Sequence, residues 1–484
     1  MHQLLVRSLY LLALSVLWWS CRSQAHRSEQ MLEMPKPNIL FIAVDDLRPE
    51  LNCYGKSHII SPYLDELASQ SLVFNRAYCQ VPVCGASRAS ILTGLRPNRQ
   101  QFIGYNTWAE KDTPHALSLP QHLKNNGYYT LSNGKVLHHT MDMRNSWSES
   151  PWFPDAGKNS HRNYILAENI KTSNAHKGGN GPAYEIADVD DEAYFDGQIA
   201  KKTIEDLERL AKQEQPFFLA AGFLKPHLPF NAPKKYWDLY DEDDIHFPEN
   251  NYVPKDAPLV AIHNSGELRN YTNIPSEGKL SEELSRRLIH GYYACVSYTD
   301  TQIGKILKAL EELGLAENTI VVLFGDHGWN LSEHTLWCKH SNFETSLRAP
   351  LMIKVPDIEG GQMTNAITEF VDIYPSLCEL AGIAVPHHVE GTSFVPLLTQ
   401  PAQNWKRYAV SKYHNGYTVK NDRYRYTEWR SKDGKSYARM LYDHATDSME
   451  TINIAESPES EAIVRELQQV IFDTYPNEFT QQGR

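Results

Sequence analysis

The sequence predicts an α/β protein built on a large, mostly parallel sheet flanked by helices, followed by a smaller C-terminal antiparallel sheet with a helix. Three observations predict this fold class. Four apolar runs of strand length are hydrophobic on both faces, as expected for strands in the middle of a helix-covered sheet. Segments with helical periodicity separate these runs. After residue 398 the pattern changes to short Tyr-rich segments separated by polar turns.

The expected central strands are residues 38–44, 128–132, 217–223 and 319–324. The second of these runs is the weakest, because Thr and Ser interrupt it. The clearest helix is expected over residues 283–313, where apolar residues repeat at three- and four-residue spacing. Gly314 follows as a residue suited to end that helix.

Two segments lack periodicity. Residues 142–190 are rich in Asn, Ser, Gly and Asp, and we interpret them as a long surface insertion that could overhang a site. Residues 228–280 are dense in Pro and acidic residues. The change of pattern near residue 398 divides the chain into a predicted catalytic domain, 36–398, and a C-terminal α+β subdomain, 399–484.

The C-terminal subdomain is expected to contain four antiparallel strands, at 408–413, 416–419, 424–429 and 438–442. A final helix over about 457–475 is expected to pack on this sheet.

The N-terminus is typical of a targeting segment. Arg7 precedes an apolar run, 9–19, which is too short to span a bilayer and suits a signal peptide covering residues 1–24. Ser20-Cys21 resembles a bacterial lipoprotein cleavage site, and Ser23-Gln24-Ala25 is the alternative. We expect an exported bacterial protein, in the periplasm or as an outer-membrane lipoprotein with a lipid anchor, with simple secretion left open.

Composition narrows the class of protein. With 484 residues, 41% hydrophobic and 22% charged, the chain is typical of a soluble globular enzyme. A net charge of −12 argues against nucleic acid as a partner, so an anionic substrate needs a locally positive pocket. The seven cysteines match neither a zinc pattern nor a dense disulfide framework. Buried thiols are expected, with one disulfide left open.

Chemically active residues follow each of the four expected strands: Asp45-Asp46, then Lys135 and His138, then Lys225-Pro226-His227, then Asp326-His327. Ligands of parallel sheets bind at the carboxyl ends of the strands. An isolated His or Lys is more often a solvated surface residue, but convergence at one sheet edge favours an active site.

Carboxylates at this edge predict a metal site. Asp45, Asp46 and Asp326 supply hard oxygen ligands that suit Ca²⁺ or Mg²⁺. Asp45-Asp46 alone would fit a turn or a helix N-cap equally well. His327 is an unusual ligand for calcium, so three roles stay open for it: binding the metal, contacting the substrate anion, or holding Asp326.

Cys84 is expected to start a helix, and Arg88, about one turn later, can point back toward the same end. A helix N-terminus beside a guanidinium favours an anion. The alternatives are a buried cysteine on an ordinary helix, or a thiolate of cysteine-protease type, which gives no reason for a divalent cation. Lys339 lies shortly after the Asp326 loop, whereas His334 and His340 are expected to be ordinary surface residues.

Cys84-Gly85-Ala86-Ser87-Arg88, with the following Ala-Ser-Ile-Leu-Thr-Gly, resembles the signature of the type I sulfatases of the alkaline phosphatase superfamily. In that family the cysteine is oxidised to formylglycine (3-oxoalanine). The resemblance spans roughly residues 36–455 and includes Leu441-Tyr442-Asp443. The Lys225–Phe230 stretch and Asp326-His327, where many sulfatases have Asp-Asn, look most like the iduronate-2-sulfatase subfamily. Ala86 is a departure, since the family usually has Pro there.

The resemblance implies one Ca²⁺, bound by five residues: Asp45, Asp46, the modified Cys84, Asp326 and His327. It implies that Arg88 stabilises the formylglycine hydrate and that Lys135 and His138 assist its attack on sulfur and the later release of sulfate. His227 and Lys339 would hold the sulfate and protonate the departing alcohol oxygen.

The predicted function is hydrolysis of sulfate esters of sulfated glycans, with an exo-acting uronate (iduronate) 2-O-sulfatase of glycosaminoglycan fragments as the specific expectation. Its partners would be a sulfated saccharide and a formylglycine-generating maturation enzyme. Two alternatives stay open: a phosphodiesterase or phosphonate monoester hydrolase on the same scaffold, and an inactive glycan-binding homologue.

Overall fold

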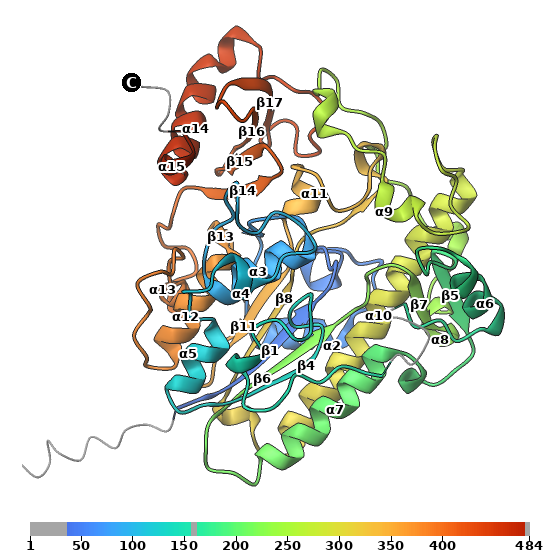
Figure 1. Cartoon of the computed structure of the whole chain (residues 1–484), viewed down its shortest axis with the longest axis vertical. Coiled ribbons are helices and arrows are strands. Elements are labelled where there is room, and N and C mark those ends of the chain that lie inside the picture. The colour runs from blue at the N-terminus through green and yellow to red at the C-terminus, as the bar shows by residue number, and fades with distance from the viewer. Residues whose placement is uncertain (1–35, 156–161, 480–484) are drawn as a thin grey trace, which may run out of the picture. The chain divides into compact units, whose positions relative to one another are not determined.

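The central feature of the computed structural model is a seven-stranded sheet with the order β12-β2-β11-β8-β1-β6-β4 (Figure 1). Its parallel part consists of the four predicted strands, which are β8 (Thr319–Gly325), β1 (Asn38–Val44), β6 (Phe217–Phe223) and β4 (Tyr129–Gly134). The predicted fold class, a mostly parallel sheet flanked by helices, is therefore confirmed.

The structure describes residues 36–155 and 162–479. The expected signal segment and Cys21 lie outside these residues. The described residues from 37 onward group as one unit by their internal contacts, and the expected division at residue 398 stays a prediction. None of the helices in the described ranges is both long and apolar enough to cross a bilayer. The six cysteines in these ranges are free thiols.

Strand β1 shows why the central runs are continuously apolar. Its alternate residues Leu40, Ile42 and Val44 pack in one hydrophobic cluster, and Ile39, Phe41 and Ala43 pack in another. The first cluster includes buried residues of α7 (Phe195–Leu210) and α10 (Glu282–Glu312). The second includes residues of α3 (Cys84–Thr93) and α12 (Ile373–Leu380). Helices thus cover both faces of the sheet, and every side chain of β1 is buried.

Three further strands of the central sheet were not expected from the sequence. β11 (Leu351–Lys354) pairs antiparallel with both β8 and β2 (Leu72–Phe74), and β12 (Gln362–Thr364) runs parallel to β2. These strands have three or four residues each, which is too short for a periodic pattern to identify them.

The predicted long helix is α10, which begins one residue earlier than expected. The Ser281 hydroxyl accepts a hydrogen bond from the backbone N–H of Leu284 and caps its N-terminus. Gly314, just beyond its end, has a φ of 69°, the left-handed conformation that glycine adopts at least cost.

The two aperiodic segments meet in a small sheet. The 142–190 segment contains α6 (Ala167–Ala175) and β5 (Tyr184–Ala187), and the 228–280 segment contributes β7 (Phe230–Pro233), which runs parallel to β5. Both segments therefore carry regular structure that composition alone did not indicate.

The C-terminal antiparallel sheet is confirmed. It consists of β14 (Ala409–Tyr413), β15 (Gly416–Lys420), β16 (Tyr424–Arg430) and β17 (Ser436–Asp443) in that order. Helix α14 (Glu461–Thr474) packs on it through a shared hydrophobic cluster.

Candidate active site

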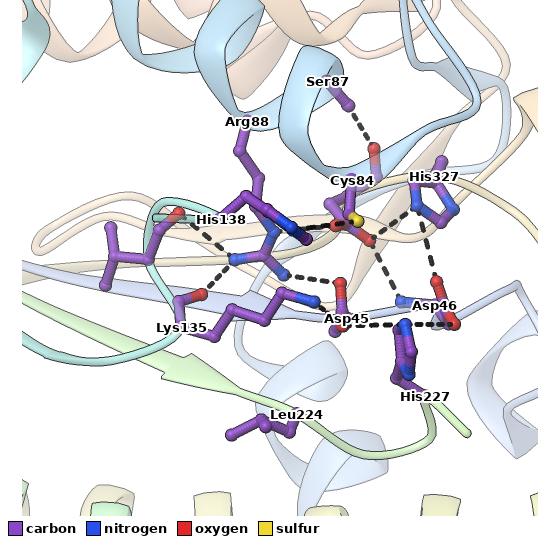
Figure 2. Close-up of polar contacts among 12 residues, drawn as sticks. Asp45, Asp46, Cys84, Ser87, Arg88, Lys135, His138, Leu224, His227 and His327 are labelled. Carbon is purple, nitrogen blue, oxygen red and sulfur yellow. Dashed lines mark hydrogen bonds and ion pairs between the residues drawn. The ribbon is translucent and has the colours of Figure 1, made fainter. Parts of the chain in front are cut away.

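The ends of the four central strands lie at one edge of the sheet because the hydrogen-bond ladder continues one residue beyond them. Asp45 N donates to Phe223 O at 3.1 Å, and Asp326 N donates to Val44 O at 3.1 Å. Lys135 N donates to Gly222 O at 2.7 Å. Figure 2 shows the resulting cluster, with Arg88, Lys135 and His227 directed toward the two aspartates.

Gly222 allows the strand ends to approach this closely. A Cβ atom at Gly222 would lie 2.1 Å from the carbonyl carbon of Lys135 and 2.5 Å from the backbone nitrogen of Val136. Only the absence of a side chain lets the segment after β4 cross here. The position of Lys135 therefore depends on a glycine in the neighbouring strand.

Four of the predicted metal ligands form one compact group. Ligand atoms of Asp45, Asp46, Asp326 and His327 all lie within 4.8 Å of one another, and all four side chains are fully buried. Asp46 has a φ of 61°, and its backbone N–H donates to Asp326 Oδ1 at 3.0 Å. Asp45, His327 and Cys84 form a second group within the same distance limit.

His327 is oriented as a metal-binding histidine would be. Its Nδ1 lies 3.0 Å from the carbonyl oxygen of Gly328 and donates to it, so Nε2 carries the free lone pair. Nε2 is buried, has no hydrogen-bond partner, and lies 3.4 Å from Asp46 Oδ1. Burial would lower the pKa of His327, but Asp326 raises it, so either a proton or a metal cation on Nε2 would compensate the facing carboxylates. The three carboxylates and this imidazole therefore fit a divalent metal.

Arg88, on α3, ties three strand ends together. Its Nε donates to Asp326 Oδ2 at 2.7 Å and its Nη2 to Asp45 Oδ1 at 3.2 Å. Its Nη1 donates to the carbonyl oxygens of Lys135 and Val136. The side chain is 1% exposed, so a fully buried guanidinium balances the charge of these carboxylates.

Helix α3 is buried over its whole length, which fixes Cys84 at its first turn. A Cβ atom at Gly85 would lie 2.2 Å from the carbonyl oxygen of Tyr105, so a glycine lets this loop pack on the helix. Cys84 Sγ lies 3.3 Å from His138 Nδ1. Burial and the nearby Lys135 lower the pKa of His138 to about 3, so its imidazole is neutral at physiological pH.

The positive charge of Lys135 and the negative charges of the aspartates compensate one another. Lys135 Nζ donates to Asp45 Oδ2. Burial would raise the pKa of Asp45, but Lys135, followed by His227 and Arg88, holds it well below its usual range. Burial raises the pKa of Asp46 despite the neighbouring Lys339.

Lys339 and His227 approach the aspartates from the other side. Lys339 is 2% exposed, and its Nζ donates to Asp46 Oδ1 at 3.0 Å and to Glu267 Oε1 at 2.8 Å. His227 Nε2 lies 3.3 Å from the same Glu267 oxygen and 3.9 Å from Asp46 Oδ2. Its Nδ1 lies 2.6 Å from Leu228 O. The structure thus brings together every residue that the sequence predicted for the site.

Glu267 was not expected. It lies on the short helix α9 (Gly266–Arg269), inside the aperiodic 228–280 segment, and it belongs to no motif. Lys339 and His227 hold the pKa of Glu267 well below its usual range, although burial acts in the opposite direction. The content of acidic residues in this segment was the only signal, and it does not single out Glu267.

Two histidines differ from expectation. His334 is 1% exposed rather than a surface residue: its Nε2 lies 2.9 Å from Met449 O, and its ring stacks on Phe343 with centroids 4.1 Å apart. That expectation was wrong, because a local polar sequence does not reveal packing against residues far along the chain. His340 is partly buried beside the site, with Nδ1 3.7 Å from Glu267 Oε2, and burial lowers its pKa to about 3.

The sequence is similar to known protein families and to known proteins. The sequence matches the family described as Sulfatase over residues 37–383, and the one described as N-sulphoglucosamine sulphohydrolase, C-terminal, over residues 332–476. The chain is 35% identical to the iduronate 2-sulfatase of Mus musculus over 415 residues, which are 77% of this chain and 73% of that protein.

Solved structures share the fold. A protein solved in complex with its substrate D-glucosamine-2-N,6-O-disulfate aligns with a TM-score of 0.71 at 22% identity, over 92% of this chain and 98% of that one. The phosphonate monoester hydrolase of Silicibacter pomeroyi aligns with a TM-score of 0.72 at 21% identity, over 92% and 96%. At these identities the likeness concerns the fold alone.

Proposed function

Because this chain belongs to the sulfatase family and is therefore a sulfuric ester hydrolase, we propose that it removes the 2-O-sulfate from uronate, above all iduronate, residues at the end of glycosaminoglycan fragments. The observation that supports this choice of substrate is the 35% identity to an iduronate 2-sulfatase over about three quarters of both chains. The Asp326-His327 pair at the metal group supports the same subfamily.

We propose that the site holds one Ca²⁺ and that Cys84 is converted to formylglycine, since the family generally uses formylglycine and a divalent metal. Asp45, Asp46, Asp326 and His327, with the modified residue 84, would hold the cation. When present, the cation supplies positive charge for the sulfate oxygens, and the modified residue supplies a nucleophilic hydroxyl that no encoded side chain offers.

His138 and Arg88 serve the nucleophile side of the reaction. The neutral imidazole of His138 lies 3.3 Å from the side-chain atom of residue 84 and can accept a proton there. Arg88 fixes Asp45 and Asp326 in place and keeps positive charge beside the start of α3.

Lys339, His227 and Lys135 supply donors for the substrate. The two lysines direct N–H groups at the cluster where the sulfate would bind, His227 does so when its ring is protonated, and Lys339 is almost completely buried. Donors already in position cost no reorganisation during the reaction, and a single one can be worth roughly 10²–10³ in rate. Lys339 and His227 are the proton donors to the departing sugar oxygen in this proposal.

The surroundings of the site suit a saccharide. Tyr105 is 59% exposed, and its ring lies edge-on to His138 at 6.1 Å between centroids. Trp108 stacks on His139 at 4.4 Å. Exposed rings next to a polar centre offer an apolar surface for a sugar ring. The net charge of −12 supports action on chain ends rather than along an extended polyanion.

We also propose export through the N-terminal segment, with a lipid anchor at Cys21, and maturation by a formylglycine-generating enzyme. The support for both lies in the sequence alone: the short apolar run, 9–19, and the motif that begins at Cys84.

The test is incubation of the purified, matured protein with a panel of defined sulfated disaccharides, with free sulfate as the readout. We expect release from non-reducing-end 2-O-sulfated uronates and little from N- or 6-O-sulfated glucosamine. Because a phosphonate monoester hydrolase shares the fold, rates on an aryl sulfate and an aryl phosphonate are measured side by side. A higher rate on the phosphonate would contradict the proposal. Binding of sulfated sugar without any sulfate release would indicate an inactive homologue.

A further inference from the structure

Glu267 places a fourth carboxylate in a site whose substrate is an anion. Its side chain is 20% exposed, and its carboxylate lies within 4.8 Å of ligand atoms of Asp46 and His227. A carboxylate beside a sulfate pocket is unfavourable unless it performs a task, because it repels the substrate. The contacts of Glu267 indicate what that task is.

One oxygen of Glu267 lies close to two basic groups. Lys339 donates to it, and His227 donates to it when its ring is protonated, because the Nδ1–H of His227 is directed to the Leu228 carbonyl oxygen. Lys339 Nζ lies 2.8 Å from Oε1, and His227 Nε2 lies 3.3 Å from the same atom. These are the two groups assigned to the leaving oxygen of the substrate. A shared acceptor fixes their distance from each other, which neither side chain could do alone.

Lys339 needs this acceptor because its other partner is a predicted metal ligand. Nζ also donates to both carboxylate oxygens of Asp46, at 3.0 and 3.1 Å. A cation held by Asp46 competes for those oxygens and repels the ammonium group. Glu267 is the remaining anionic partner that holds Lys339 at the site.

The backbone around Glu267 is tied to the segment that carries Lys339. Ser265 Oγ accepts a hydrogen bond from the backbone N–H of Trp337 at 3.0 Å. The residue before α9 is thus fixed to β10 (Trp337–Cys338), which directly precedes Lys339. This connection fixes the side chains of Glu267 and Lys339 relative to each other.

The same atoms could be considered a second cation site, formed by Asp46, His227 and Glu267. Lys339 already provides a positive charge between the two carboxylates, so that space has its cation. The arrangement is therefore a lysine–histidine pair bridged by a carboxylate.

We propose that Glu267 is a positioning residue that holds Lys339 and His227 together on the leaving-group side of the sulfate. The inference rests on the proposed sulfatase reaction. In that step the sulfuryl group would pass to a hydroxyl of the modified residue 84, whose proton would move to His138. The bond between sulfur and the sugar oxygen breaks, its electron pair stays on the sugar oxygen, and a proton from this donor pair completes the alcohol.

Leaving-group dependence separates positioning from general structural support. A nitrophenolate leaves without a proton, whereas a sugar alkoxide needs one. Glu267→Gln should lower kcat on a 2-O-sulfated uronate disaccharide by a factor on the order of 10². On 4-nitrophenyl sulfate it should lower kcat by less than about tenfold. Glu267→Asp, which keeps the charge on a shorter arm, should recover part of the loss on the sugar.

Glu242→Gln is the matched control. Glu242 belongs to the same segment, is 24% exposed, and likewise pairs with one cation and one histidine, Arg287 at 2.8 Å and His290 at 3.6 Å. It should leave both rates unchanged. The formylglycine content and melting temperature of each variant are measured first, and kcat is expressed per converted chain.

Equal losses of kcat on both substrates for Glu267→Gln would overturn the positioning role, and so would an unchanged rate on the sugar. Wild-type protein that is fully converted but hydrolyses neither sulfate ester would overturn the proposed function itself. The two failures are therefore distinguishable.

Discussion

His138 Nδ1 lies 3.3 Å from Cys84 Sγ, so a partly buried imidazole contacts the predicted nucleophile. The two residues come from different elements, the first turn of α3 and the segment after β4. Because burial and Lys135 lower the pKa of His138 to about 3, the ring is available as a base over the whole range in which the protein would work.

His138→Ala should therefore lower kcat for sulfate release by roughly 10²–10⁴ without loss of bound metal. His122→Ala is a control histidine, whose ring contacts the Ala384 carbonyl oxygen and the ring of Tyr374 rather than the site, and it should be neutral. Steady-state kinetics and metal analysis of both proteins test this. A normal kcat for His138→Ala would contradict the role.

Lys339→Ala should lower kcat by at least roughly 10²–10³, since it removes a donor that is 2% exposed and already in position. Metal content should stay intact, because Lys339 is not among the expected ligands. Elemental analysis alongside kinetics decides the matter, and near-normal turnover would refute the assignment.

Removal of divalent metal should abolish sulfate release and lower the melting temperature. Three buried carboxylates then repel one another, and a ligand at 100 times its Kd stabilises a fold by about 2.7 kcal/mol. Dialysis against a chelator followed by addition of Ca²⁺ or Mg²⁺ tests this, with Ca²⁺ expected to restore more activity. Full activity after complete removal of metal would contradict the site.

Gly222→Ala should destabilise the protein by about 1–3 kcal/mol and lower kcat, because its Cβ would collide with the backbone of Lys135. Gly104→Ala is the matched control, since a Cβ there meets no atom within 4 Å. Thermal unfolding and kinetics of the two variants provide the comparison. Equal stabilities would show that the strand ends can separate without cost.

Stability should fall in acid partly through Glu344. Burial would raise its pKa, but Arg425, helped by His444, lowers it from 4.5 to about 2. A carboxyl with a depressed folded-state pKa stabilises the fold above its unfolded value, here roughly 3 kcal/mol at most, and this contribution is lost as pH falls from 4.5 toward 2. Glu344→Gln should therefore cost stability at pH 7, and the difference from wild type should shrink progressively below pH 4.5. A constant difference across chemical denaturation at several pH values would contradict it.

The sequence identified those parts of the fold whose pattern is local. Strands β1, β6 and β8 are apolar on both faces because helices cover both faces, and such runs are visible without a structure. The strands β2 and β12 were missed because each has only three residues. Each forms a strand only by pairing with a segment about 290 positions away in the sequence.

In the site, too, the residues that follow a local pattern were predictable and those placed by long-range packing were not. Asp45, Lys135 and Asp326 were predictable because each comes directly after a recognisable strand, and parallel topology brings strand ends together. Glu267 reaches the same place from a four-residue helix in a segment without periodicity, 72 positions before Lys339. Its position depends on long-range packing, which no local pattern encodes.

The burial of Cys84 has a consequence for the proposed conversion to formylglycine. Its side chain is 3% exposed, and every residue of the helix that it begins is buried. In the proposed maturation, an enzyme that oxidises Cys84 would need access to a side chain that the folded protein buries. We therefore expect the proposed conversion to precede the packing of α3, so that a chain that folds first would keep its thiol.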